Sequence, residues 1–284
     1  MESEASAPAA ISIVNAIPTG RGGAVAIDAP VTARVRLDTD AEGVTGRSAD
    51  GYVIDPTLIE RCVSAVTERF GTGEGGTVET ETSVPPSVGL KTSSAVANAT
   101  VAATLDALGC WDRVDDIDAT RLGVDIARSV GVTVTGALDD AAASMLGGIV
   151  LTDNRDDTVL TRDTWDAEVA ILLPAQTRPT SEVDVKAYAE VAPIAEVAVE
   201  LACESRYDRA MAVNGLAVAT AGHLDMGPIT TALAHTTAVS PSGTGPAIAA
   251  VGDPSSLDAV EESWSSFDGE IMRTSLLDSG IDVA

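Results

Sequence analysis

The segment of the sequence that is richest in chemistry is PPSVGLKTSSA (85–95), a turn followed by a run of hydroxyl side chains. Two prolines end a strand and preset the turn, and Gly89 permits a close backbone approach that a side chain would block. Thr92, Ser93 and Ser94 stand where a helix begins, and the N–H groups and positive dipole end of a helix N-terminus favour phosphate. Hydroxyls there can also ligate Mg²⁺. The alternative is an ordinary polar helix cap.

A second segment, GVTVTGALDDAAAS (131–144), places two adjacent carboxylates after a strand-like run of Val and Thr and after Gly136. A carboxylate beside a bound phosphate and metal can orient a hydroxyl or accept its proton. The alternative is that Asp139 and Asp140 only cap the helix that begins at about residue 140. Because the two like charges share a short turn, we expect the pKa of one of them to be raised.

Two further loops have side chains or N–H groups suited to an anion. In SPSGTGPAIAAVGD (240–253), Gly243 and Gly245 flank Thr244, and such a loop can turn N–H groups toward an anion. Glycine–serine loops without a ligand are common, so this signal is weak alone. In NAIPTGRGGAVAID (15–28), the guanidinium of Arg21 can bind a carboxylate or phosphate through two hydrogen bonds, or it can be an exposed loop arginine.

Strands and helices must position these segments. The patterns predict strands at 9–16, 24–28, 31–38, 77–84, 149–153, 168–174 and 269–277, and one more into which the glycine-rich segment 240–253 runs. They predict helices at 55–70 (capped by Asp55), 95–108, 115–130, 138–147, within 182–236, and at 254–265. Residues 1–8 read as a loose tail and 40–51 as a loop or hairpin tip. This order predicts an α+β or mixed α/β fold rather than regular βαβ repeats, with a lobe boundary in the acidic segment 154–163.

The first segment resembles the phosphate-binding loop of the GHMP kinases, small-molecule kinases whose founding members act on galactose, homoserine, mevalonate and phosphomevalonate. Their pattern P-x-x-x-G-L-x-[ST]-S is matched by Pro85, Gly89, Leu90, Thr92 and Ser93. The segment is not a P-loop, because GxxxxGK[ST] needs a glycine directly before the lysine, where this chain has Leu90.

Two departures from the common GHMP pattern narrow the resemblance. Lys91 replaces the usual glycine or serine, and Ser94 stands where alanine is commonest. A lysine directly after Gly-Leu is similar to the archaeal shikimate kinases of this superfamily. TGALDDA resembles the catalytic aspartate region of the same branch, and the loops at 240–253 and 15–28 resemble its third and first motifs. The four segments follow the family order, so the resemblance covers nearly the whole chain.

The resemblance implies a two-lobe α+β fold with ATP and substrate in the cleft between the lobes. The N-terminal α/β lobe with a mixed sheet would span residues 1–160, and a ferredoxin-like α+β lobe residues 161–284. The implied reaction is phosphorylation of the 3-hydroxyl of shikimate by ATP with Mg²⁺, a step of chorismate and aromatic amino-acid synthesis. The alternatives are another GHMP kinase, acting on homoserine, mevalonate or a sugar, and a non-catalytic binding protein of the same fold.

The same resemblance assigns roles to individual residues. Asp139 is the candidate base, with Asp140 beside it, and Ser93 is the preferred Mg²⁺ ligand, with Thr92 as second choice. Asp125 is a further metal candidate because of its place before the strand-like run of the second segment, not because of the resemblance. The residues expected to bind ATP are Pro85, Pro86, Ser87, Val88, Gly89, Leu90, Lys91, Thr92, Ser93, Ser94 and Ala95. Those expected on the substrate side are Arg21, Asp140, Ser242, Gly243 and Gly245.

The charge of the chain is typical of a protein from a salt-rich cytoplasm. There are 43 acidic and 17 basic residues, a formal net charge of −26, and only Lys91 and Lys186 are lysines. Such a field opposes binding to nucleic acid and anionic membranes, and molar salt screens its self-repulsion. Nucleic acid and membranes are therefore not expected as partners, and the resemblance implies ATP and a small-molecule substrate instead. The oligomeric state is left open.

The remaining composition is consistent with a cytoplasmic enzyme. The three cysteines, Cys62, Cys110 and Cys203, form no Cys/His cluster, so we expect reduced, buried thiols. Two histidines do not favour a histidine-based zinc site. We expect neither a signal peptide in the acidic N-terminus nor a membrane span in the apolar stretch 131–151, which two aspartates interrupt. With 3% aromatic residues, Ala, Val, Leu and Ile must form the core.

Overall fold

The computed structural model describes residues 1–51, 56–133, 137–175 and 183–284. The predicted cap Asp55 and the predicted turn residue Gly136 lie outside these ranges, as does residue 182, where the predicted helical region begins.

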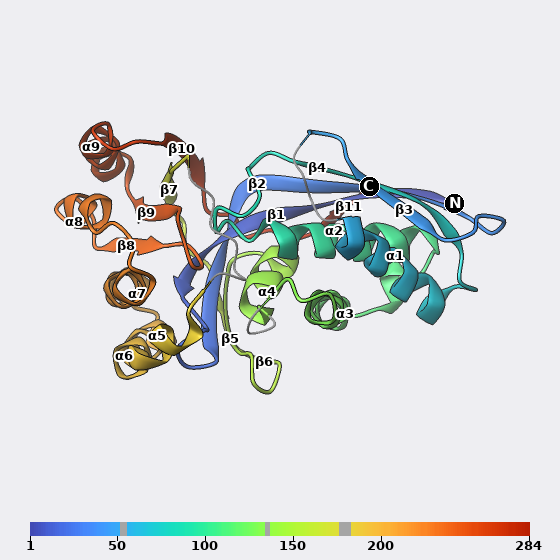
Figure 1. Cartoon of the computed structure of the whole chain (residues 1–284), viewed down its shortest axis with the longest axis horizontal. Helices are drawn as coiled ribbons and strands as arrows, with labels where there is room; N and C mark the ends of the chain where they lie inside the picture. The colour runs from blue at the N-terminus through green and yellow to red at the C-terminus, as the bar shows by residue number, and fades with distance from the viewer. Residues whose placement is uncertain (52–55, 134–136, 176–182) are drawn as a thin grey trace.

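A long antiparallel hairpin is the framework of the first sheet (Figure 1). It consists of β1 (Glu2–Val14) and β2 (Arg21–Asp38), paired from Glu2↔Arg36 to Val14↔Gly23. The second half of β2 pairs with β4 (Gly75–Thr82), and its first five residues pair with β5 (Ile149–Asp153). The sheet is completed by β3 (Val44–Ser48), β6 (Thr158–Asp163) and β11 (Asp282–Val283). It is mixed, as predicted, because β3 and β4 are parallel.

Helices cover one face of this sheet (Figure 1). They are α1 (Pro56–Phe70), α2 (Thr92–Ala107), α3 (Asp116–Ser129) and α4 (Leu138–Leu146), with a short 3-10 helix (Trp111–Arg113). The central helix α2 contacts β1 and β2 as well as α1, α3 and α4, and its residues 95–105 are all buried. A helix enclosed on all sides must have small side chains, which explains the alanine-rich sequence of α2.

The second half of the chain forms a four-stranded antiparallel sheet in the order β10-β7-β9-β8. Its strands are β7 (Glu168–Leu173), β8 (Ala238–Pro241), β9 (Ile248–Gly252) and β10 (Glu270–Ser275). The accompanying helices are α5 (Val185–Glu190), α6 (Ala192–Cys203), α7 (Tyr207–Gly222), α8 (Gly227–Ala232) and α9 (Pro254–Trp264). Trp264 is fully buried, and its indole Nε1 donates to the Pro228 carbonyl at 2.8 Å, which joins α9 to α8.

Four predictions about strands are wrong. The predicted loop 40–51 contains a strand, β3, which pairs in parallel with β4. Residues 2–8 are not a tail but the start of β1, because Ala5 and Ala7 are buried while Glu2 and Glu4 face the arginines of β2. The predicted strands 24–28 and 31–38 are one strand, β2. The stretch 158–163, read as an acidic boundary loop, is β6, which pairs with β5. In each case cross-strand pairing decides the structure where local polarity suggested a loop.

The division into lobes at residues 160 and 161 stays a prediction. The two sheets agree with two structural halves, but β6 belongs to the first sheet through residue 163. The last strand, β11, also pairs with β1, at Ala5↔Val283 and Ser6↔Asp282. The end of the chain therefore returns to the sheet in which the chain begins.

The core consists mainly of Ala, Val, Leu and Ile, as predicted from the scarcity of aromatic residues. All three cysteines are free; Cys62 and Cys110 are buried, whereas Cys203 is exposed, contrary to expectation. Burial raises the pKa of the Cys62 thiol to about 12, so this thiol is unreactive at neutral pH. Within the described part of the chain, no helix combines the length and apolar character that crossing a bilayer requires.

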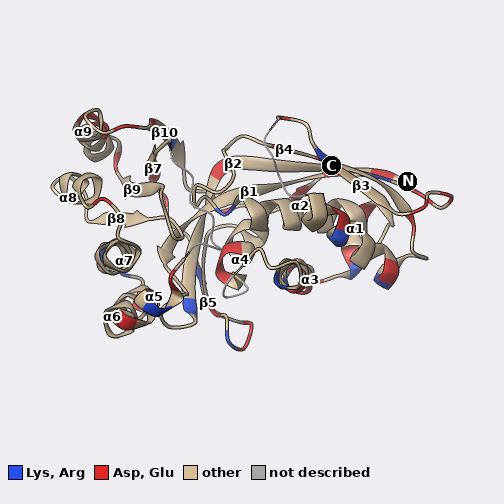
Figure 2. Ribbon diagram, viewed as in Figure 1, with Lys and Arg blue, Asp and Glu red and all other residues tan. Residues whose placement is uncertain are grey.

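Stability is expected to depend on salt. Figure 2 shows acidic residues on helices and loops of both halves of the molecule, and the net charge is −26. The Debye length shrinks from ~10 Å at 0.1 M to ~3 Å at 1 M salt, which screens this repulsion. We therefore expect Tm to rise steadily in thermal melts between 0.1 and about 2 M KCl. A Tm that is flat or falls over this series would contradict the prediction.

Candidate active site

Loop 85–95, which precedes and enters α2, packs against a loop that is distant in the sequence, residues 240–246. A Cβ on Gly89, whose φ is 100°, would collide with the carbonyl oxygen of Ser242, so only glycine fits. The Ser242 hydroxyl donates to the Gly89 carbonyl at 2.7 Å, and the Ala247 N–H donates to the Val88 carbonyl at 3.0 Å. The close approach expected of Gly89 is therefore present, and its partner is the third predicted motif.

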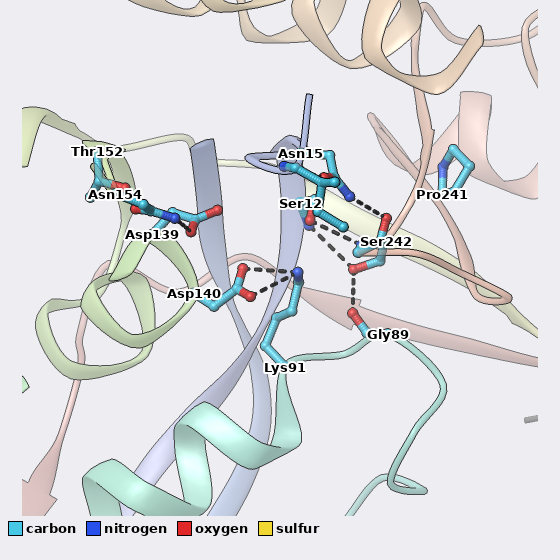
Figure 3. A network of polar contacts seen from close by, with 12 residues as sticks. Ser12, Asn15, Gly89, Lys91, Asp139, Asp140, Thr152, Asn154, Pro241 and Ser242 are labelled. Atoms are coloured by element: carbon cyan, nitrogen blue, oxygen red, sulfur yellow. Dashed lines mark hydrogen bonds and ion pairs between the residues drawn. The ribbon is translucent and has the colours of Figure 1, made fainter. Parts of the chain in front are cut away.

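The end of β1 attaches to the same loop 240–246 (Figure 3). The Ser12 N–H donates to Ser242 Oγ at 3.2 Å, and the Gly243 N–H donates to Ser12 Oγ at 3.0 Å. The side-chain amide of Asn15 donates to the Gly243 carbonyl at 2.7 Å. Ser12, Asn15 and Ser242 are all buried. Side-chain and backbone hydrogen bonds thus join three of the four predicted segments into one rigid unit.

Lys91 connects this unit to Asp140, the neighbour of Asp139 (Figure 3). Its ammonium group lies 2.8 Å from Asp140 Oδ1 and 3.0 Å from Oδ2, and the two side chains are only 11% and 12% exposed. A Cβ on Gly243 would lie 3.1 Å from Lys91 Nζ, so the ammonium also borders loop 240–246. Lys91 has φ 60°, a left-handed conformation that costs a side-chain residue about 1–2 kcal/mol. Here a lysine occupies a position whose backbone favours glycine.

Asp139 is the carboxyl group whose pKa is raised. It lies in the first turn of α4 and is 3% exposed. Burial, and then the charge of Asp140, raise its pKa to about 7, against the opposing effects of Lys91 and of a hydrogen bond from Asn154. The direct ion pair of Lys91 is with Asp140, so Asp139 has no cation bound to it among the described residues. Only the structure decides which of the two aspartates is shifted.

The helix-start hydroxyls differ in accessibility. Ser93 is exposed in the first turn of α2, whereas Thr92 is 5% exposed, and its Oγ1 has no hydrogen-bond partner among the described residues. A ligand can therefore approach Ser93 directly. Among the described residues, no three His, Cys, Asp or Glu side chains gather into a metal centre. A metal at this site would depend on a hydroxyl, water and ligand oxygens, which is the usual environment of Mg²⁺ bound to a nucleotide.

Asp125 is not brought to this cluster. It lies on α3, its side chain is 71% exposed, and it forms an ion pair with Arg128 at 3.4 Å. Its position shortly before the aspartates in the sequence suggested a metal ligand, but the helical register turns it toward solvent. We do not retain it in the proposed metal site.

Arg21 lies beside the site but faces away from Asp139. Its guanidinium pairs with Glu196 of α6. Successive residues of a strand point to opposite faces, and the neighbouring Gly22 is the residue of β2 that faces Asp139. A substrate contact by Arg21 would therefore require its guanidinium to exchange Glu196 for the ligand.

Two residues near Asp139 were not identified from the sequence. Asn154 donates from Nδ2 to Asp139 Oδ1 at 2.8 Å, and Thr152 donates to Asn154 Oδ1 at 2.6 Å. Both were assigned to a strand end and to the start of a loop, without a role. The usable signal was an uncharged amide at the end of an apolar strand, in a segment otherwise rich in charge.

Comparison with known proteins gives close relatives. The sequence profile of the family described as "GHMP kinases N terminal domain" matches residues 57–148, a span that contains loop 85–95 and both aspartates. A shikimate kinase of Halobacterium salinarum is 47% identical over 96% of this chain and 96% of its own length. A shikimate kinase of Methanothrix thermoacetophila is 45% identical over 97% of this chain and 94% of its own length.

Solved structures share the fold at low sequence identity. Homoserine kinase from Cytophaga hutchinsonii has a TM-score of 0.80 and 18% identity, covering 100% of this chain and 97% of that one. Mevalonate kinase from Methanococcus jannaschii has a TM-score of 0.77 and 12% identity, covering 97% of this chain and 98% of that one. These likenesses confirm the two-lobe α+β fold that the motifs implied.

Proposed function

The chain belongs to the shikimate kinases of the GHMP kinase superfamily, and we propose that it transfers the γ-phosphoryl group of ATP to the 3-hydroxyl of shikimate. One observation carries the mechanism. A buried carboxyl with a raised pKa, Asp139, lies next to the ion pair between Asp140 and the lysine of the phosphate loop. This arrangement supports a proton acceptor and a cation for phosphate in one cluster, as phosphoryl transfer requires.

Loop 85–95 is the proposed site for the ATP phosphates. The N–H groups of Ser94 and Ala95 already donate to the Lys91 carbonyl. The N–H groups of Thr92 and Ser93 come first in α2, where a helix has no internal acceptor to offer. These groups and the positive end of the α2 dipole would bind phosphate oxygens, and the Lys91 ammonium would add a full charge. Short contacts of this kind persist in molar salt better than long-range attraction does.

Asp139 is the proposed acceptor of the proton from the attacking hydroxyl. A base is most effective when its pKa lies near the working pH, and burial raises the pKa of Asp139 to about 7. Lys91 would neutralise Asp140 in the free enzyme and face the transferred group when nucleotide is bound. Mg²⁺, held by the nucleotide and by Ser93, would neutralise charge that develops on the phosphate oxygens. The chain's own contribution is alignment and a positive environment.

The substrate side rests on Arg21, Asp140 and loop 240–246. Arg21 is the candidate partner for the carboxylate of shikimate, because a guanidinium binds a carboxylate through two hydrogen bonds. Ser242, Gly243 and Gly245 would line the same cleft from the second half of the chain. The free cysteines and the net charge of −26 support a reducing cytoplasm and small-molecule partners.

A coupled ADP-release assay in molar KCl tests the assignment. Shikimate, homoserine, mevalonate and galactose would be offered in parallel at equal concentration, with ATP and Mg²⁺. We expect turnover with shikimate alone, and phosphorus NMR of the product should show a phosphate monoester on the 3-hydroxyl. If ADP release were faster with another alcohol, that alcohol would be assigned as the substrate in place of shikimate. ATP binding without turnover would indicate a non-catalytic protein.

The Mg²⁺ role of Ser93 predicts an effect that depends on metal concentration. Ser93→Ala removes the exposed hydroxyl in the first turn of α2. We expect turnover to fall most at low Mg²⁺ and to recover in part at high Mg²⁺, because a lost ligand weakens metal binding. The measurement is a Mg²⁺ titration of turnover at fixed ATP.

The matched control is Ser129→Ala on α3, also exposed, whose hydroxyl donates only within its own helix, to the Ile126 carbonyl. This variant should behave as the wild type at every Mg²⁺ concentration. A loss in Ser93→Ala that is the same throughout the titration would assign Ser93 to helix capping instead.

A further inference from the structure

Three buried side chains form a hydrogen-bonded chain that ends on the proposed base (Figure 3). The Thr152 hydroxyl donates to Asn154 Oδ1 at 2.6 Å, and Asn154 Nδ2 donates to Asp139 Oδ1 at 2.8 Å. The exposed fractions of Thr152, Asn154 and Asp139 are 0%, 6% and 3%. Buried hydrogen bonds of this kind hold a side chain in one rotamer far better than exposed ones do.

We propose that Thr152 and Asn154 are positioning residues that hold the Asp139 carboxylate in the orientation and charge state needed for proton transfer, a role that rests on the proposed function of Asp139. The logic is that of a base oriented by a further polar group. Neither residue touches the reacting atoms; both act through Asp139.

The direction of the hydrogen bonds supports a specific role. A side-chain amide presents a donor on one side and an acceptor on the other. The amide oxygen of Asn154 accepts from Thr152, so its NH₂ group must face Asp139. If the amide were reversed, its oxygen would face Asp139 Oδ1. Two acceptors would then meet unless Asp139 were protonated. The chain Thr152–Asn154 therefore favours the ionised form of Asp139, which is the form that can accept a proton.

The backbone fixes this arrangement from both sides. The Asn154 N–H donates to the Gly20 carbonyl at 2.8 Å, and Thr152 pairs with Gly22 across β5 and β2. A Cβ on Gly22 would collide with Asp139 Oδ2. Asp139 thus has Asn154 at one carboxyl oxygen and the space left by Gly22 at the other. A shift of either strand would move the carboxylate, and small displacements of a catalytic group have large effects on rate.

The charged neighbours of Asp139 are few. On its own helix it faces Asp140, and from loop 85–95 it faces Lys91. Gly22 of β2 and Asn154 of the turn after β5 approach Asp139 directly, and Thr152 of β5 reaches it through Asn154; all three are uncharged. The hydrogen bond from Asn154 is one of the effects that hold the pKa of Asp139 down against burial. Removing it should raise that pKa further.

The test uses Asn154→Ala, Thr152→Val and Thr152→Ser in the full-length enzyme. For Asn154→Ala we expect kcat to fall about 10- to 100-fold, as is common when the partner that orients a functional group is removed. The rising limb of the kcat/KM profile against pH should move to higher pH, while the KM for ATP changes less than about twofold. Thr152→Val should give the same changes in weaker form, and Thr152→Ser, which restores the hydroxyl, should recover most of the rate.

A double-mutant cycle separates positioning from general damage. In the Asp139→Asn background, Asn154→Ala should cause little further loss, because its target is already absent. The proposal would be overturned if Asn154→Ala lowered kcat by the same factor in the wild type and in Asp139→Asn. It would also be overturned if Asn154→Ala lowered kcat but left the rising limb of kcat/KM against pH unchanged. Thr152→Val preserves side-chain shape and gives the same readings if Asn154→Ala does not fold. A fully active Asp139→Asn enzyme would instead refute Asp139 as the base. The kcat of this single variant shows that outcome before any Asn154 variant is made.

Discussion

Asp139→Asn is expected to lower kcat by about 10²- to 10⁴-fold, the scale associated with a positioned general base. The amide has nearly the same shape but cannot accept the proton of the attacking hydroxyl. The KM for ATP should change little, because the proposed nucleotide contacts come from loop 85–95. The matched control is Asp163→Asn, which should leave kcat unchanged. Asp163 accepts a hydrogen bond from the Tyr207 hydroxyl at 2.7 Å and lies outside the cluster. A near-normal kcat in Asp139→Asn would shift attention to Asp140.

The pH dependence of the wild-type enzyme follows from the same group. The pKa of Asp139 is raised to about 7 by burial, so the base is protonated and inactive below that pH. We expect kcat/KM for shikimate, which reports the free enzyme, to rise with pH through a limb near 7. The limb should be absent from the residual activity of Asp139→Asn. A limb near pH 4 in the wild type would mean that Asp139 is not the group that titrates.

As pH rises through about 7, the contribution of Asp139 to the free energy of unfolding should fall while activity rises. The pKa of Asp139 is higher in the folded protein than in the unfolded chain, so the folded state binds the proton more tightly. The stabilisation from this group is complete below about pH 4, the unfolded pKa, and is lost as pH rises through about 7, the folded pKa. Above pH 7 the buried charge opposes folding, and Asp139→Asn removes it. The Tm of this variant at pH 8 should equal or exceed that of the wild type.

Lys91→Met is expected to have the second largest effect. It removes the cation that, among the described residues, lies between loop 85–95 and the aspartates. The loss of one electrostatic stabiliser commonly costs about 10²- to 10³-fold in rate. The kcat/KM for ATP should fall by that order. The pKa of Asp139 should also rise, because the charge of Lys91 lowers it, so the pH limb should move upward. Steady-state kinetics across pH would measure both effects.

Two controls separate the chemistry of Lys91 from its structural contribution. Lys186→Met, the other lysine of the chain, is exposed on α5 and should have wild-type kinetics. Lys91→Met leaves Asp140 buried and unpaired, which by itself can cost about 3–5 kcal/mol of stability. Adding Asp140→Asn should restore the Tm but not the rate. If the double variant regained activity, the contribution of Lys91 would be structural only.

Much of the site could be predicted from the sequence because its segments carry local requirements. Gly89 is needed where the backbone of loop 240–246 approaches, and hydroxyls at the start of a helix are candidate ligands by position alone. Most of the helices follow from periodicity and helix signals in the same way, whereas the mixed sheet was implied by the resemblance to the GHMP kinases. The charge of −26 and the two lysines are properties of composition alone.

Other features depend on contacts between segments that are distant in the sequence. Periodicity assigned residues 2–8 and 158–163 to a tail and a loop, but pairing with β2 and β5 makes them strands. Asp125 looked equivalent to the other acids until the register of α3 turned it to solvent. The raised pKa of Asp139 depends first on its burial and then on the charge of Asp140, and the importance of Asn154 depends on β5 lying beside β2. The sequence by itself determined which groups are available; the tertiary structure decided which of them are buried, paired and aligned, because burial and pairing are set by neighbours that no local pattern encodes.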